Sequence, residues 1–402
     1  GMSMAYSMLN RGGINELVLI DIDKDKTIGE EMDLSHGLPF APQKMVIKAG
    51  DYDECKDAQV VVITAGIAQK PGQTRLELAE TNTRIMKSIT KSIMASGFNG
   101  IIIVASNPVD LMTYVVSKVS GLPKNQVFGS GTVLDTARLR YLMSDYLKVS
   151  SKNIHAYIMG EHGDSSFVPW EHAYVGCKKI KDVMEDNNHP MKDLEKIHKD
   201  VINAAYEIIN KKKATYYGIG MSLNRLVRAV LDNENSILTV STYLKDGQYG
   251  QDDIYIGVPA IINSNGIREL VDLELNEEEQ AKLKRGETYR TYIVVTARYG
   301  EYRKSKKYEI RIVPKKNISQ TNVFYKIQQY LKKEEQENRY SRDIKIPSVY
   351  KDIEITKRQE NQGGISGILI LFVTVCIFIP LHNYLKLQEE GKKCQEQAER
   401  DF

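Results

Sequence analysis

Apolar runs that alternate with helical patterns over the first 127 residues constrain the fold most strongly. The runs at 16–20, 60–63 and 101–105 are short, continuous and rich in Val, Ile and Leu, which is typical of strands buried on both faces of a parallel sheet. Residues 76–96 have the pattern of an intervening helix. This alternation predicts an α/β fold with a Rossmann-type parallel sheet.

After Ser150 the pattern changes and indicates a second domain. HAYIMG at 155–160 is followed by a long helical pattern at 191–211, and then by strand patterns at 237–244 and 254–262. A mixed order of this kind is typical of an α+β domain. We therefore expect a dinucleotide-binding domain over 1–129 and a mixed α+β substrate domain over 130–285.

A histidine framed by glycines is the clearest candidate for chemistry, in Gly160-Glu161-His162-Gly163-Asp164. The glycines suit a turn and leave room for a ligand beside the imidazole ring. Asp135 and Arg138 lie upstream. The carboxylate would hold the ring tautomer and favour the charged imidazole, while the guanidinium would bind a substrate carboxylate through two bonds. The set predicts proton-coupled chemistry on a small carboxylic acid, with a purely structural His–Asp pair as the alternative.

Six motifs carry a resemblance to a known family. In chain order they are ELVLIDID (16–23), AGIAQKPGQTR (65–75), VASNPVD (104–110), GSGTVLDTARLR (129–140), HAYIMGEHGDS (155–165) and KKATYYGIGMS (212–222). Over residues 1 to about 285 the chain resembles the bacterial-type L-lactate dehydrogenases of the lactate/malate dehydrogenase family. The resemblance implies reversible hydride transfer between NADH and pyruvate, with lactate as the reduced product.

The resemblance implies a role for each matching residue of the active site. His162 would exchange the proton, Asp135 would orient the His162 ring, and Arg75 would polarise the substrate carbonyl. Four further residues would contact the substrate, namely Gln69, Arg138, Asn107 and Thr215. Gln69 stands at the family's specificity position. A neutral amide there favours pyruvate over oxaloacetate, so malate dehydrogenase is the less favoured alternative.

The cofactor implied by the resemblance is NAD. Asp21 ends the first strand pattern, where a carboxylate can accept both ribose hydroxyls and repel a 2′-phosphate. The other implied cofactor contacts are Gly1, Gly66, Asn107 and Ile219. No metal-ligand spacing occurs among the cysteines, so we expect no metal site.

An allosteric anion site is also implied by the resemblance. Arg140 and His155 match the positions that bind fructose 1,6-bisphosphate across a subunit interface in bacterial enzymes of this kind. An Arg and a His from each of two subunits would neutralise the phosphate charge. A homotetramer is expected on the same grounds.

The beginning of the chain departs from the family pattern. Gly1 matches the third glycine of the family's Gly-x-Gly-x-x-Gly fingerprint, and residues 2–11 match the helix after it. The resemblance therefore lacks the first strand and the first two glycines. We expect the strands at 16–21 and 60–64 to be separated, and the activity and NADH affinity of the chain as written to be weak.

From Gly286 onward the chain no longer resembles the family. Residues 286–402 carry a net charge of +7 and residues 1–285 one of −4, which together give the +3 of the whole chain. Within 286–314 two alternating runs flank a glycine, which predicts a β-hairpin. Residues 315–362 are polar and charge-mixed, so we expect a disordered linker. The basic excess is not clustered on a recognisable module, and no nucleic-acid partner is expected.

An uncharged, apolar stretch at 363–385 is long enough to span a bilayer as a helix, and residues 386–402 would form a tail. The four cysteines fit a reducing compartment. The expected location is therefore cytoplasmic, with possible membrane anchorage through 363–385. Two alternatives of other classes stay open. One is a catalytically dead, membrane-tethered binding module. The other is a mis-joined reading frame.

Overall fold

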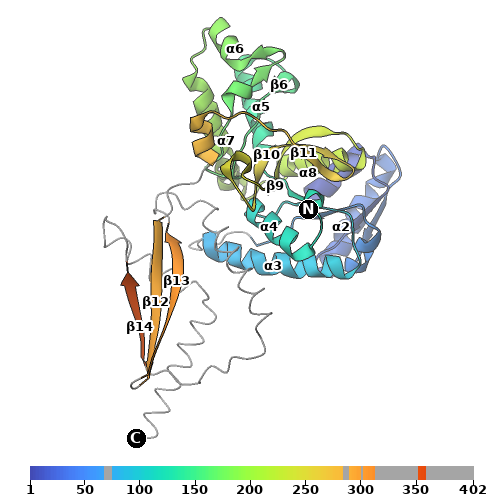
Figure 1. Ribbon diagram of the computed structural model, residues 1–402. Coiled ribbons are helices and arrows are strands. Elements are labelled where there is room, and N and C mark those ends of the chain that lie inside the picture. The colour runs from blue at the N-terminus through green and yellow to red at the C-terminus, as the bar shows by residue number, and fades with distance from the viewer. Residues whose placement is uncertain (68–74, 284–288, 300–301, 313–351, 359–402) are drawn as a thin grey trace. The chain divides into compact units, whose positions relative to one another are not determined.

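The computed structural model describes most of the first 283 residues and three strands beyond them. The described ranges are 1–67, 75–283, 289–299, 302–312 and 352–358. They belong to two compact units, of which the first contains residues 1–283 and the second contains the three strands after residue 288. Each unit is described by itself (Figure 1).

The centre of the first unit is a six-stranded sheet in the order β11-β10-β9-β5-β4-β3. Its parallel half consists of β3 (Val60–Ile63), β4 (Ile101–Val104) and β5 (Val127–Gly129). All four residues of β4 are buried, as expected for a continuous apolar run covered on both faces. The helices α3 (Arg75–Ala95) and α4 (Val109–Ser120) connect these strands. The predicted Rossmann-type α/β fold is thereby confirmed.

The strands β1 (Glu16–Leu19) and β2 (Val46–Ala49) form a separate two-stranded parallel sheet. The helix α2 (Lys24–His36) connects them, and the Asp23 carboxylate caps it by accepting from the amide of Lys26. Within the described ranges β1 does not pair with β3. This agrees with the separation expected for residues 16–21 and 60–64.

The antiparallel half of the large sheet connects the two parts of the unit. It consists of β9 (Ser236–Leu244), β10 (Ile254–Asn263) and β11 (Gly266–Leu270). A single bridge, between Gly129 and Ser241, joins β5 to β9. A side chain on Gly131 would collide with the backbone amide of Ser241, so small residues let the strands meet there.

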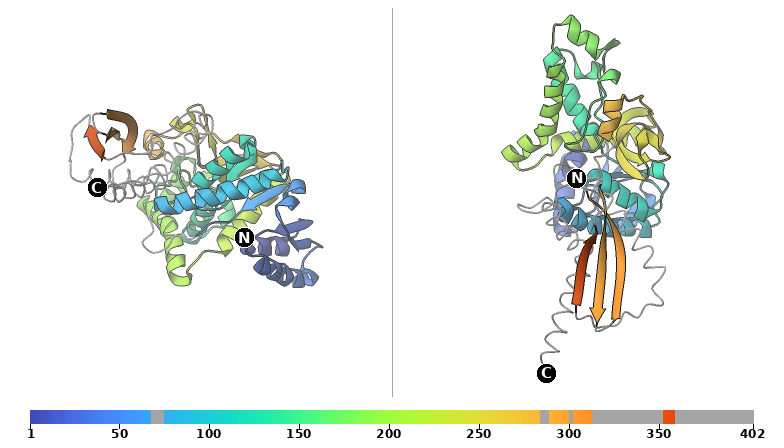
Figure 2. Two further views of the ribbon diagram at one scale, coloured as in Figure 1. Left: turned by 90° about the horizontal axis from the view of Figure 1, so that it is seen from below. Right: turned by 60° about the vertical axis from the view of Figure 1, so that its left-hand side comes forward.

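A smaller layer of helices and short strands lies at one end of this unit. It is shown mostly in green at the top of Figure 1 and at the top of the right-hand view of Figure 2. Its members are α5 (Val133–Leu147), β6 (Ile154–His155), β7 (Tyr174–Val175), β8 (Lys178–Lys179), α6 (Ile180–Asp186) and α7 (Lys192–Lys212). Its core contains Leu139, Met143, Ile158 and Leu194 among others, all almost fully buried. The mixed order expected after Ser150 is thus present.

The helix α1 (Met2–Arg11) packs against α8 (Tyr217–Leu231). A Cβ atom on Gly220 would lie 2.8 Å from the carbonyl carbon of Ser3, so the absence of a side chain permits this contact. The buried Asn224 amide donates to the hydroxyl of Ser7 over 2.8 Å. These contacts fix the start of α1 against α8.

The remaining elements are short. The helix α9 spans Glu277–Leu283. Six 3-10 turns occur in the described ranges, at Leu38–Phe40, Tyr52–Asp57, Lys124–Gln126, Ser151–Asn153, Trp170–His172 and Gln248–Gly250.

The second unit contains a three-stranded antiparallel sheet. The strands β12 (Tyr289–Tyr299) and β13 (Tyr302–Ile312) pair along their whole length, and β14 (Asp352–Arg358) pairs with the other edge of β12. The first two strands coincide with the two runs predicted within 286–314. The third lies inside the segment 315–362, for which we expected no regular structure, so that expectation was wrong for 352–358. The pairing of β14 with β12 involves residues far apart in the sequence.

No helix in the described ranges is long and apolar enough to cross a membrane. The predicted membrane span at 363–385 and the tail at 386–402 lie outside those ranges.

Candidate active site

His162 and Asp135 are brought together by the fold. The Nδ1 atom of His162 lies 2.6 Å from Oδ2 of Asp135, although 27 residues separate them in the sequence. Asp135 is on the first turn of α5, and His162 is on the loop after Gly160. The Asp135 side chain is 11% exposed and that of His162 is 27% exposed. The pair is therefore shielded but open to solvent on the histidine side.

Arg138 completes this cluster on the next turn of α5. Its Nη1 atom donates to Oδ1 of Asp135 over 2.9 Å, so the two oxygens of Asp135 accept from different partners. The guanidinium side chain is 15% exposed. The structure thus places all three residues predicted from the two motifs in one contiguous group.

The charges of this group shift the pKa values of its members. Burial alone would lower the pKa of His162. The adjacent carboxylate of Asp135, and then that of Asp110, oppose this effect, so that the pKa of His162 is raised above its usual value. Burial would raise the pKa of Asp135, but His162 and Arg138 hold it below its usual value. The arrangement favours a charged imidazole beside an ionised carboxylate.

The loop that carries His162 is held at both ends by backbone hydrogen bonds. Met159 and Phe167 exchange two bonds, of 2.8 and 3.0 Å. Gly160 and Gly257 of β10 exchange two more, of 2.9 and 3.0 Å. Gly160 has φ 97°, a conformation that favours glycine. The backbone conformation of this turn therefore favours glycine at position 160, as the motif predicted.

Asp110 was not singled out by the sequence analysis, yet it lies against the histidine. It is on the first turn of α4 and is 2% exposed. Its Oδ2 atom accepts from the backbone amide of His162 over 3.1 Å, and its Oδ1 atom accepts from the hydroxyl of Ser241 over 2.6 Å. The signal in the sequence is an acidic residue at the start of a mostly apolar helix, in the motif VASNPVD.

Several predicted cofactor residues lie at one edge of the parallel strands. Asp21 follows β1, Gly66 follows β3 and Asn107 follows β4, and ligands of open α/β sheets bind beyond the carboxyl ends of such strands. Gly1 precedes α1 and approaches Thr64 so closely that a Cβ atom would lie 3.1 Å from its hydroxyl. The segments that carry Gly66 and Asn107 thus follow strands of the six-stranded sheet, whereas Asp21 follows a strand of the separate two-stranded sheet.

Two of these features suit a dinucleotide. Asp21 is exposed, so its carboxylate is accessible to ribose hydroxyls. The ten-residue helix α1 begins directly after Gly1 with no side-chain cap, and the N-terminus of a helix favours a phosphate. The residues present therefore fit NAD at its adenosine and phosphate parts.

Comparison with known proteins identifies the family. The chain matches the lactate/malate dehydrogenase NAD-binding domain over residues 1–129 and the alpha/beta C-terminal domain over residues 132–289. L-lactate dehydrogenase 2 of Bacillus cereus is 56% identical over 283 residues, which are 70% of this chain and 90% of that relative. The chain belongs to the lactate/malate dehydrogenase family. The resemblance noted in the sequence is thereby confirmed.

Two solved structures of this family are similar to the chain. A lactate dehydrogenase from a Medee basin deep-sea metagenome library is 55% identical, with a TM-score of 0.69, and the match covers 70% of this chain and 90% of that one. The minor L-lactate dehydrogenase of Enterococcus mundtii, in its ligands-bound form, is 49% identical with a TM-score of 0.69, over 71% and 90% of the two chains.

Two further positions that the family motifs indicate lie around the start of α8. Thr215 precedes this helix and Ile219 is in its first turn, and both are partly buried. Lys212 lies 4.5 Å from the ring centre of Tyr216 and 4.3 Å from that of Tyr217. The lysine thus bridges the end of α7 and the start of α8, with Thr215 between them.

Two positions of this family site lie wholly or partly outside the described residues. Gln69 falls in the undescribed range 68–74. Arg75 begins α3, but its side chain is not described.

The expected allosteric residues are neighbours in this dehydrogenase fold. The Nε atom of Arg140 on α5 donates to the carbonyl of Ala156 over 3.1 Å, directly beside His155 of β6. The guanidinium lies 5.1 Å from the ring centre of Tyr157. Burial lowers the pKa of Arg140, and Tyr157 opposes this effect. His155 is exposed.

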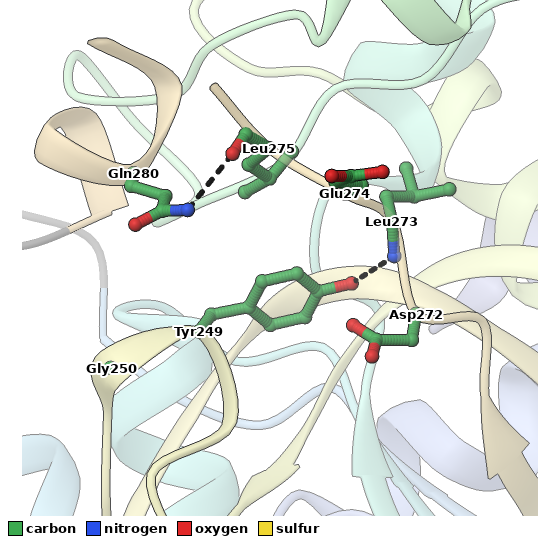
Figure 3. A pocket seen from close by; sticks show the side chains of 7 residues that line it. All are labelled: Tyr249, Gly250, Asp272, Leu273, Glu274, Leu275 and Gln280. Carbon is green, nitrogen blue, oxygen red and sulfur yellow. Dashed lines mark hydrogen bonds between the residues drawn. The ribbon is translucent and has the colours of Figure 1, made fainter. Parts of the chain in front are cut away.

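A cavity of about 270 Å³ lies elsewhere in this dehydrogenase chain (Figure 3). It is lined by Tyr249, Gly250, Asp272, Leu273, Glu274, Leu275 and Gln280. The hydroxyl of Tyr249 accepts from the amide of Leu273 over 2.9 Å, and burial raises its pKa to about 12. None of the predicted site residues lines this cavity, so it gives no support to the site around His162.

Proposed function

We propose that this chain catalyses reversible hydride transfer between NADH and pyruvate, as an NAD-dependent L-lactate dehydrogenase. The short contact between His162 and Asp135 carries the proposal. It forms a charged proton donor, which is what reduction of a ketone to an alcohol requires. The L-lactate dehydrogenases to which the chain is similar support this choice of reaction.

The proton is exchanged at His162. Its Nδ1 atom contacts Asp135, so Nε2 is the atom that gives the proton to the ketone oxygen and takes it back in lactate oxidation. Asp135 stabilises the charged ring and fixes its tautomer. When bound, NADH supplies the hydride that reaches the carbonyl carbon.

Pyruvate is held by side chains around His162. Nη1 of Arg138 donates to Asp135. The other donors of the guanidinium therefore bind the pyruvate carboxylate. Arg75 and Asn107 stabilise the negative charge that develops on the ketone oxygen. Gln69 and Thr215 surround the methyl group, and the neutral Gln69 selects against a second carboxylate.

The cofactor is NAD rather than NADP, because the exposed Asp21 would repel a 2′-phosphate. Gly1, Gly66 and Asn107 contact the cofactor at the sheet edge. Ile219 packs against the nicotinamide ring from the start of α8.

The enzyme is a homotetramer that binds fructose 1,6-bisphosphate through Arg140 and His155. The proximity of these two residues and the exposure of His155 support this part of the proposal. The effect on pyruvate KM tests it. The bisphosphate lowers the KM of the unmodified chain and leaves that of His155→Ala unchanged. An equal response of both proteins would contradict this site.

Residues 363–385 anchor the otherwise cytoplasmic chain in a membrane, because the sequence from Asn361 to Leu385 carries no Asp, Glu, Lys or Arg. The full chain then sediments with membranes and resists alkaline carbonate extraction. A chain that ends at residue 360 stays in the supernatant. Release of the full chain by carbonate would contradict the anchor.

The reaction is tested by following NADH oxidation by the full chain with pyruvate and with oxaloacetate. We expect weak turnover with pyruvate, a still weaker response to oxaloacetate, and loss of turnover in His162→Asn. NADH binding, measured by fluorescence, is expected to be retained in that variant, because His162 is not among the adenosine and phosphate contacts. NADH binding without turnover by the unmodified chain would instead favour a catalytically dead binding module.

A further inference from the structure

Asp110 places a second buried carboxylate at the candidate active site, beside Asp135. Its side chain is 2% exposed and comes from α4, whereas Asp135 comes from α5. The two acidic residues therefore reach His162 from different elements.

The bonds of Asp110 tie three separate segments together. One carboxylate oxygen accepts from the backbone amide of His162, on the loop after Gly160, over 3.1 Å. The other accepts from the hydroxyl of Ser241 on β9 over 2.6 Å. Ser241 also forms the bridge that joins β5 to β9, so this contact is anchored in the centre of the sheet.

A carboxylate in this position acts on the histidine in two ways. The bond to the His162 amide fixes the backbone that presents the ring. Its negative charge also favours the protonated imidazole, and a charge buried in the protein is weakly screened by solvent.

We infer that Asp110 is a positioning residue that, together with Asp135, holds His162 protonated in the resting enzyme. The inference rests on the proposed role of His162 as the proton donor. Asp110 acts without touching the substrate, because its carboxylate oxygens contact the His162 amide and the Ser241 hydroxyl. Its effect on the reaction passes through the charge and the position of the imidazole.

Other charged groups surround His162. Asp135 and Arg138 face it from α5, and Glu161 and Asp164 belong to its own loop. From α7, the half-buried His198 interacts electrostatically with Asp135, and burial lowers its pKa. Asp110 is the acidic group that contacts His162 from α4.

Asp110→Asn is the sharpest variant. Its amide oxygen can still accept from the His162 backbone, and its NH₂ group can donate to the hydroxyl of Ser241. This variant keeps the size of the side chain and both hydrogen bonds but removes the negative charge. The matched control is Ser241→Ala, which removes the hydroxyl bond but leaves the carboxylate.

The protonation of His162 can be measured without turnover. Diethyl pyrocarbonate modifies the neutral imidazole, so the rate of modification is proportional to the neutral fraction of His162. Mass spectrometry of the peptide that contains His162 distinguishes it from the other six histidines of the chain. The measurement uses the full chain without substrate. Asp110→Asn is expected to lower the midpoint of the curve of modification rate against pH by roughly one pH unit. Ser241→Ala is expected to move it by much less.

Two results would overturn the inference. One is an unchanged midpoint in folded Asp110→Asn. The other is an equal shift in Ser241→Ala, which would assign the effect to packing rather than to charge. If thermal unfolding shows that Asp110→Asn is not folded, Asp110→Ser takes its place with the same expected direction.

Kinetics then separate this inference from the proposed function. If the chain reduces pyruvate, pyruvate KM begins to rise at a lower pH in Asp110→Asn than in the unmodified chain. The difference in pH equals the shift in the midpoint of the modification rate. A general structural defect would instead lower kcat at every pH. If the unmodified chain does not reduce pyruvate, the proposed function fails, but the modification midpoint still decides the role of Asp110.

Discussion

Asp135 Oδ2 lies 2.6 Å from Nδ1 of His162, and Asp135 Oδ1 lies 2.9 Å from Nη1 of Arg138. One carboxylate thus holds the proposed proton donor and the proposed substrate-binding guanidinium at a fixed separation. Asp135 and Arg138 share α5, whereas His162 enters from a loop. Asp135 therefore links the side chains of the proposed donor and of the proposed substrate-binding residue directly.

Asp135→Asn is expected to disable the donor with little loss of fold. The amide can still contact the ring, but it no longer stabilises the imidazolium, so the pKa of His162 falls. Pyruvate KM at neutral pH then rises and kcat falls. Steady-state kinetics over a pH series measure both, with circular dichroism as the control for folding. Unchanged kinetics would contradict the proposed role of Asp135.

The pH dependence of the two reaction directions is expected to be opposite. Pyruvate reduction needs protonated His162, and the carboxylates of Asp135 and Asp110 raise the pKa of this group. Pyruvate KM should therefore be low below that raised pKa and increase about tenfold per pH unit above it. Lactate oxidation needs the neutral ring, so lactate KM should increase as the pH falls. Parallel profiles in the two directions would rule out His162 as the shared proton carrier.

Gly220→Ala is expected to destabilise the chain. A Cβ atom there would lie 2.8 Å from the carbonyl carbon of Ser3, and α1 would have to move away from α8. Overpacking of this kind costs about 1–3 kcal/mol. A lower melting temperature and weaker NADH binding should follow, since α1 begins at the proposed phosphate contact.

Gly29→Ala is the matched control for that variant. Gly29 is also inside a helix, but no atom lies within 4 Å of its added Cβ. Alanine there should raise the free energy of unfolding by about 0.5–1 kcal/mol, through better helix propensity. Equal effects of the two variants would show that the contact between Gly220 and Ser3 is unimportant.

Gln69→Arg is expected to change substrate preference from pyruvate toward oxaloacetate. A positive charge would pair with the second carboxylate of oxaloacetate and would be left unpaired beside the methyl group of pyruvate. An unpaired buried charge costs about 3–5 kcal/mol, which corresponds to roughly two to four powers of ten in kcat/KM. The ratio of kcat/KM for the two substrates measures this change. Gln69→Met, which adds no charge, should still prefer pyruvate.

Much of the fold follows from local patterns in the sequence. The apolar runs at 60–63 and 101–105 became β3 and β4, and the helical pattern at 191–211 became α7 at Lys192–Lys212. These patterns are readable because burial on both faces of a sheet selects continuous apolar runs, whereas burial of one helix face selects a period of 3.6. By contrast, β14 was missed, because its pairing with β12 joins segments far apart in the chain.

The sequence by itself determined the residue types of the site, since the motifs around Asp135 and His162 supply a carboxylate, a guanidinium and an imidazole between glycines. The tertiary structure decided which of them meet. Asp110 is 52 residues from His162 and 131 from Ser241, and no local pattern relates them. They come together because the sheet aligns α4, β9 and the loop after Gly160, and because a buried carboxylate is stable only where donors from such separate segments converge on it.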